Sequence, residues 1–278
     1  MKKHLKYLLT GLAAATLVAC GGGGGNGTST TSSLTGTAAV GAPLAGATVV
    51  LKDSTGKTLT QTAGADGTYT FADVSGLTAP LMLQATGTAG GTNYTLHSLL
   101  SAAPAAGVSG VINVSTQTEA ATAQAIGAEP AAVFADATKI KAIDATKLAD
   151  AKARLNAALA DVLTALGKDP KTVDVFTTAF KADNTGLDKL LDLVSVNNAV
   201  TSSGQSMQVT YKSNPTITTT ITPETKTADV TKLAVTTETL KADASLDTSG
   251  IKTMISSFNG LTDTADRIKS AAMLDVFD

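Results

Sequence analysis

A histidine and two nearby serines are the first residues of this chain whose side chains could take part in catalysis. His97 lies in the segment Tyr94-Thr95-Leu96-His97-Ser98-Leu99, and Ser101 follows shortly after. A histidine that takes a proton from a serine is the centre of many hydrolases, but the Gly-x-Ser-x-Gly turn that exposes such a serine is absent. The segment alternates like a strand, so we interpret His97 as a strand histidine, hydrogen-bonded or facing solvent.

Few histidines and cysteines are present that could bind a transition metal. His97 is the only histidine outside the first 19 residues, and Cys20 is the only cysteine. Zinc sites with several histidines and two-histidine iron sites are therefore excluded within one chain. Asp66 precedes Gly67 without the further acidic residues that a calcium loop needs, so we predict a turn aspartate. We expect neither a metal nor a cofactor.

Two carboxylates, Asp188 and Asp192, stand one helical turn apart. A carboxylate pair could act as acid and base, but glycoside hydrolysis needs two carboxyl groups on opposite sides of a cleft. Lys189 lies between the two, and a solvated helix face explains the spacing equally well. We therefore assign no catalytic residues and expect the protein not to be an enzyme.

The composition argues against nucleic acid as a partner. The chain carries 21 basic and 23 acidic residues, with no basic patch among aromatic residues and no tryptophan. Aromatic residues make up only 4% of the chain, which also disfavours sugar sites built on stacked rings.

The first twenty residues have the pattern of a secretory signal. Three lysines precede an apolar run from Leu8 to Ala19 that is too short to span a bilayer. The run ends in Leu17-Val18-Ala19-Cys20, which resembles the lipobox of bacterial lipoproteins. The resemblance implies cleavage between Ala19 and Cys20 and fatty acylation of Cys20, so that residues 1–19 are a lipoprotein signal peptide and the membrane is a partner through this anchor.

Residues 20–33 form the predicted lipidated cysteine and a flexible linker. The stretch after Cys20 is rich in Gly, Ser and Thr and has no apolar residue that would offset the entropy of ordering. It is not a phosphate loop, because no Lys-Ser/Thr pair follows and no strand precedes it. In lipoprotein sorting of the enterobacterial type, an aspartate directly after the lipidated cysteine retains the protein at the inner membrane. This chain has Gly21 at that position. We therefore expect anchoring at the cell outer membrane, on its periplasmic or surface face.

Residues 34–115 have the short alternating runs of an antiparallel β-sandwich. Ala47, Val49 and Leu51 fall on one face of a strand, and the turn at Asp66-Gly67 leads into Thr68-Tyr69-Thr70-Phe71. These runs, with Gly36 and Pro43-Leu44-Ala45-Gly46 before them, resemble the carboxypeptidase regulatory-like family. That resemblance implies a transthyretin-like (prealbumin-like) sandwich that serves as an accessory module without catalytic residues of its own.

The period changes to that of helices after Ser115. Residues 116–200 are predicted to be a helical bundle with helices over 116–126, from Asp144 to Gly167, over 173–180 and over 187–194. Residues 201–278 are predicted to be a mixed β/α region, with strands that include Met207, Val209 and Tyr211 and continue through Leu233, Val235 and Leu240. Two amphipathic helices after residue 250 complete an α+β multidomain chain.

These patterns favour a non-catalytic, membrane-anchored lipoprotein that binds or supports a protein or an envelope polymer. The alternative is a small-ligand carrier or an enzyme. Its site would lie in the helical and C-terminal regions or in a further domain beyond Asp278.

Overall fold

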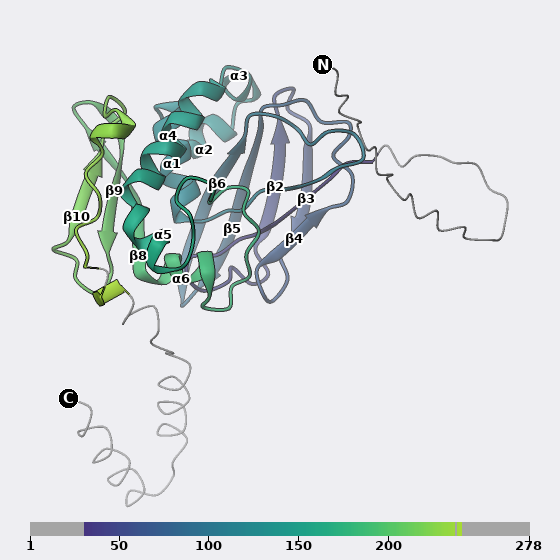
Figure 1. Cartoon of the computed structure of the whole chain (residues 1–278). Coiled ribbons are helices and arrows are strands. Elements are labelled where there is room, and N and C mark those ends of the chain that lie inside the picture. Colours follow the sequence, from purple (N-terminus) through teal and green to yellow (C-terminus); the bar gives the residue numbers. More distant parts are fainter. Residues whose placement is uncertain (1–30, 237, 241–278) are drawn as a thin grey trace, which may run out of the picture.

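A computed structural model describes residues 31–236 and 238–240 (Figure 1). The predicted signal peptide, the cleavage site at Ala19, the anchor at Cys20 and the two C-terminal helices lie outside the described residues. The described part is a mixed α+β fold with one four-stranded and two three-stranded sheets, which confirms the predicted class in its broad form.

Seven strands form an N-terminal unit over residues 33–114. The larger sheet has the antiparallel order β3-β2-β5-β6, and the smaller sheet has the order β4-β1-β7. The strands are β1 Ser33–Thr37, β2 Thr48–Asp53, β3 Thr58–Thr62, β4 Thr68–Phe71, β5 Leu81–Ala89, β6 Thr92–Leu100 and β7 Ser109–Val111. One core of alternating apolar residues, among them Val49, Leu51 and Phe71, joins the two sheets.

This arrangement is compatible with the predicted β-sandwich, with one difference. β7 pairs in parallel with β1, on the side of β1 opposite β4. The smaller sheet is therefore mixed, whereas the sequence pattern predicts antiparallel strands only.

Six α-helices follow between residues 116 and 193. They are α1 Thr116–Ile126, α2 Pro130–Phe134, α3 Ala137–Lys141, α4 Ala145–Ala158, α5 Ala160–Ala165 and α6 Gly186–Leu193. Helices α1, α3 and α4 begin at a residue whose side chain accepts from the backbone of the first turn. Ser115 and Thr118 form a capping box at the start of α1, and Gly127 ends that helix in the left-handed conformation. The predicted helix from Asp144 to Gly167 is present, with a break at Leu159.

The predicted helix over 173–180 is wrong, since this segment consists of turns. The backbone N–H of Asn113 donates to the Phe176 carbonyl, and its side-chain amide donates to the carbonyls of Val175 and Thr178. These carbonyls therefore accept hydrogen bonds from the N-terminal unit and not from the N–H groups of a helix.

The third sheet has the antiparallel order β10-β9-β8, with β8 Val194–Thr201, β9 Gly204–Tyr211 and β10 Thr218–Ile221. The predicted strand through Met207, Val209 and Tyr211 is confirmed. β8 occupies the last residues of the region predicted to be helical. Leu233 and Val235 are buried but do not extend the sheet, because the backbone N–H of Leu233 donates to the Ala158 carbonyl at the end of α4. Leu240 lies in a short helical turn over 238–240.

The helices do not form a bundle with a core of its own. α1 lies between the four-stranded sheet and the third sheet and contacts β6, β8, β9 and α4 (Figure 1). Four buried alanines on α1 (Ala120, Ala121, Ala123 and Ala125) let both sheets approach the helix closely. One apolar core therefore runs from Met82 and Leu99 in the N-terminal unit to Val209 in the third sheet.

Candidate functional site

His97 is completely buried on β6, on the face of the four-stranded sheet that the helices cover. Its Nδ1 lies 2.9 Å from Oε2 of Glu119 on α1, and its Nε2 lies 3.0 Å from Nε2 of Gln84 on β5. Both ring nitrogens are satisfied if Nδ1–H donates to Glu119 and Nε2 accepts from Gln84. The interpretation of His97 as a hydrogen-bonded strand histidine is therefore confirmed.

The same residues join α1 to the edge of the sheet. The backbone N–H of His97 donates to Glu119, and its carbonyl accepts from the Thr118 hydroxyl. Ser98 points to the opposite face of the strand, as the neighbour of His97 must, so the two side chains do not form a nucleophile–base pair. The role of His97 in the described structure is to hold α1 against β6.

Asp188 differs from the prediction of a solvated helix face, and Asp192 is half-buried. Asp188 is completely buried, and its Oδ2 accepts from the backbone N–H of Asn184 at 2.7 Å. Its Oδ1 has no hydrogen-bond partner among the described residues. Burial raises the pKa of Asp188 to about 6, and the nearby charges of Asp192 and Asp183 add to the effect. A solvated helix face is thus wrong for Asp188, which helps to close the turn before α6.

Asp66 is the predicted turn aspartate. Its Oδ1 accepts from the backbone N–H of Thr68 at 3.0 Å and from the Thr68 hydroxyl at 2.7 Å. These two bonds lower the pKa of Asp66. The same Asp-x-Ser/Thr pattern closes turns at Asp53, Asp73, Asp136 and Asp183. Short polar side chains that hydrogen-bond the backbone two residues on are ordinary turn formers, so this repeated signal could have been found in the sequence.

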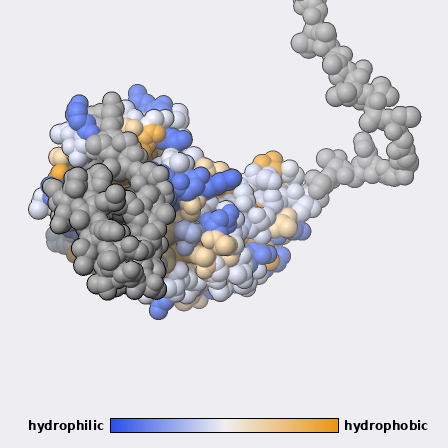
Figure 2. Space-filling model, turned by 90° about the horizontal axis from the view of Figure 1, so that it is seen from below, coloured by the Kyte–Doolittle hydropathy of each residue, from blue (hydrophilic) through white to orange (hydrophobic). Residues whose placement is uncertain are grey.

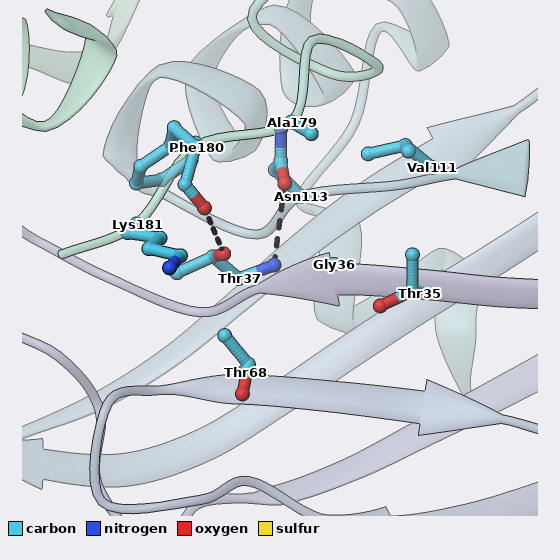
Figure 3. A pocket seen from close by; sticks show the side chains of 9 residues that line it. All are labelled: Thr35, Gly36, Thr37, Thr68, Val111, Asn113, Ala179, Phe180 and Lys181. Carbon is cyan, nitrogen blue, oxygen red and sulfur yellow. Dashed lines mark hydrogen bonds between the residues drawn. The ribbon is translucent and has the colours of Figure 1, made fainter.

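An open hollow of about 320 Å³ lies on the outer face of the smaller sheet (Figure 3). One side is formed by β1, β4 and β7 with the chain just after it, and the other side by residues 179–181, which precede α6. The lining residues are Thr35, Gly36, Thr37, Thr68, Val111, Asn113, Ala179, Phe180 and Lys181.

Hydrogen bonds hold residues 179–181 beside the smaller sheet. The Thr37 hydroxyl donates to the Phe180 carbonyl at 2.7 Å, and the Thr37 backbone N–H donates to Oδ1 of Asn113 at 3.2 Å. Figure 3 shows Phe180 and Lys181 beside Thr37 at one end of the hollow, with Thr35 and Val111 at the other. The sequence pattern missed this site, although buried Asn113 is visible as a polar residue in the apolar run Val111-Ile112-Asn113-Val114.

The lining residues offer recognition groups instead of a reacting pair. Threonine hydroxyls donate and accept hydrogen bonds, Lys181 carries an exposed ammonium group, and Phe180 gives a half-buried apolar wall. Such a set suits a small hydroxylated or anionic group. A second hollow, of about 530 Å³, lies between α4 and residues 227–232 and is lined mainly by small side chains such as Ala153 and Ala157.

The described residues lack two kinds of special site. They contain no group of three or more His, Cys, Asp or Glu residues placed to hold a metal ion. They also contain no helix long and apolar enough to cross a membrane. No family model, curated protein or solved structure matches this chain.

Proposed function

We propose that the protein is a lipid-anchored, non-catalytic binding or structural module of a bacterial cell envelope. The observation that carries the proposal is the position of Cys20, the only cysteine in the chain. It follows a basic and apolar signal-like segment directly and precedes a Gly-rich stretch. One acyl chain gives only marginal membrane binding, so stable anchoring at the outer membrane would require more than one chain on Cys20.

The N-terminal unit is proposed to be a sandwich of the carboxypeptidase regulatory-like kind. Two sheets that share one apolar core support this proposal, as does the hairpin turn at Asp66-Gly67. In this proposal the unit is an accessory module, and the linker holds it typically some 20 Å from the lipid.

The non-catalytic part of the proposal is supported by the bonds that the candidate residues make. His97 fastens a helix to a sheet edge, Asp66 closes a turn, and Asp188 accepts the Asn184 N–H. Each of these groups has a structural task that accounts for its presence.

Membrane fractionation tests the anchor. We expect wild-type protein in the outer-membrane fraction and the Cys20→Ser variant in the soluble fraction, because only acyl chains hold the protein to lipid. Ser29→Ala, in the same linker, is the matched control and should fractionate like wild type. Gly21→Asp should shift the protein toward the inner membrane in a host with sorting of the enterobacterial type. A Cys20→Ser variant that stays in the membrane fraction would contradict the proposal.

A small-ligand carrier is the second candidate, and the hollow beside α4 favours it. Native mass spectrometry of the purified protein would detect a retained ligand as added mass. If the carrier reading holds, Ala157→Phe should abolish that added mass by filling the hollow, whereas Ala132→Phe, exposed on α2, should not. Protein that never carries added mass would count against this candidate.

A further inference from the structure

One face of the four-stranded sheet changes character halfway along its strands. Where helices cover it, the outward side chains are Met82, Leu99 and His97, all completely buried. Where nothing among the described residues covers it, most outward side chains of the same strands are threonines, with half-buried Val50 and exposed Asn93 among them. Side chains alternate between the two faces along a strand, and all of these residues stand at alternate positions. The change from buried residues to threonines therefore occurs on one face of the sheet only.

Four of these threonines stand directly opposite one another across all four strands. Thr62 on β3 pairs with Thr48 on β2, Thr48 pairs with Thr86 on β5, and Thr86 pairs with Thr95 on β6. All four are exposed. Because neighbouring strands lie about 4.8 Å apart, the four residues form a row across the sheet with about that spacing.

Two further exposed threonines widen the row into a surface. Thr60 lies two residues from Thr62 on β3, and Thr88 lies two residues from Thr86 on β5, which places each about 6.7 Å along its strand. We call Thr48, Thr60, Thr62, Thr86, Thr88 and Thr95 the threonine face.

We propose that the threonine face docks the flat side of an uncharged, hydroxyl-rich polysaccharide. The inference rests on the proposed function as a binding module and names the class of its partner. Each threonine offers a hydroxyl oxygen that can accept a hydrogen bond and a methyl group that can contact the C–H side of a sugar ring. Apart from that of Thr88, which donates to Asn93 Oδ1 at 2.7 Å, these hydroxyls can also donate, as sugar hydroxyls do. No stack of aromatic rings is needed for such contacts.

Charge selects the kind of polymer. Among the outward side chains of these four strands, Lys52 is the one that carries a charge, and it lies at the covered end, where its Nζ donates to the carbonyls of Phe134 and Ala135. An acidic or basic polymer would meet no counter-charge beside the row, whereas a neutral polymer loses no ionic hydration there. Seen from below, the side of the molecule toward the N-terminal trace is mostly pale, with separate blue and orange residues among the pale ones (Figure 2).

Side-chain stiffness favours a flat and repeating partner. Threonine is β-branched, and its restricted χ1 rotamers lose little entropy when a ligand fixes them. A second copy of this chain is a poorer partner, because the centre of a stable homodimer interface is more apolar than a row of threonines.

Co-sedimentation tests the proposal with the complete mature chain carrying Cys20→Ser. We expect insoluble cellulose to deplete this protein from solution and carboxymethyl-cellulose, the same polymer with charges, to deplete it much less. Thr48→Lys with Thr86→Lys should weaken binding to cellulose at least ten-fold. Thr70→Lys is the matched control, since Thr70 is an exposed strand threonine on the other sheet, and it should bind like the parent.

A second double variant shows whether a loss of binding comes from the lost hydroxyl groups or from misfolding of the first double variant. Thr62→Lys with Thr95→Lys changes only the two edge strands of the sheet and should show the same loss, with an unchanged urea midpoint. The proposal is overturned if the parent protein stays in solution with cellulose and with an insoluble neutral β-glucan, or if both double variants bind like the parent. It is also overturned if these variants abolish a dimer seen by analytical ultracentrifugation. Correct fractionation of the lipidated protein would leave the proposed anchor standing in each case.

Discussion

Replacement of Asp188 by asparagine should stabilise the protein at neutral pH. Asp188 is completely buried, its Oδ1 has no hydrogen-bond partner among the described residues, and its pKa is raised to about 6. Ionised Asp188 therefore opposes folding, because the charged form is better solvated in the unfolded chain. The asparagine keeps an oxygen that can accept from the Asn184 N–H but carries no charge.

The magnitude follows from the shift in pKa. An ordinary aspartate titrates near 3.9, so the shift is about two units, and each unit corresponds to about 1.4 kcal/mol. Ionisation of Asp188 thus costs at most about 3 kcal/mol above pH 7. The buried amide group of asparagine and its weaker bond to Asn184 remove part of that gain, since a neutral hydrogen bond contributes only about 1 kcal/mol. We expect a net stabilisation of roughly 1–2 kcal/mol at pH 7.5.

The sign of the pH dependence follows from the same shift. Because the folded pKa lies above the unfolded one, the folded state binds more protons between about pH 4 and pH 6. Asp188 therefore destabilises the wild type progressively as the pH rises through that window. The advantage of Asp188→Asn should be complete by about pH 7.5, should shrink as the pH falls, and should vanish only below about pH 3, where Asp188 is protonated in the folded and the unfolded state.

Urea unfolding of the Cys20→Ser mature chain at pH 4.5, 6.0 and 7.5 measures the effect. The control is Asp161→Asn, which removes a carboxylate from the exposed ion pair with Lys232. Surface pairs contribute little, so this control should stay within about 0.5 kcal/mol of the parent at every pH. If Asp188→Asn is destabilising, and equally so at pH 4.5 and 7.5, the bond to Asn184 and not burial of the charge dominates, and the reasoning is refuted.

Three further predictions concern the N-terminal unit. Asn113→Ala should lower the free energy of unfolding by about 3 kcal/mol in urea titrations, because it leaves the buried groups of Thr37, Val175 and Thr178 without their partner; a loss below 0.5 kcal/mol would contradict this. Gly36→Ala should prevent folding, as circular dichroism would show, since its Cβ would lie 1.7 Å from the Ile112 carbonyl oxygen; a native spectrum would disprove the close approach. Limited proteolysis should cut first within residues 21–33, and a first cut within 45–71 would refute a stably folded sandwich in this unit.

Local patterns predicted those elements whose hydrogen bonds are local. Helix α1 begins at the capping box of Ser115 and ends at Gly127, and both signals are legible in the sequence. The turn at Asp66 is equally local, since its partner Thr68 is two residues away. For such residues the neighbouring chain decides the conformation, and tertiary contacts only confirm it.

Predictions failed where a segment far away in the sequence determines the local conformation. The turns over 173–180 depend on Asn113, about sixty residues earlier, which takes the carbonyls that a helix would use. The burial of Asp188 follows from the packing of α6 between other elements, and its spacing from Asp192 cannot show that. The hollow beside Phe180 escaped prediction for the same reason, because its two sides come from separate parts of the chain. The threonine face needs the register of four strands, which only the fold provides.

The central claim is that acyl chains on Cys20 hold this protein at a membrane. Mass spectrometry of the N-terminal peptide from protein purified out of native membranes tests it most directly. We expect a mature chain that begins at Cys20 and carries the mass of a diacylglycerol group with a further acyl chain on its amino group. A chain that begins at another residue, or an unmodified Cys20 thiol, would contradict it.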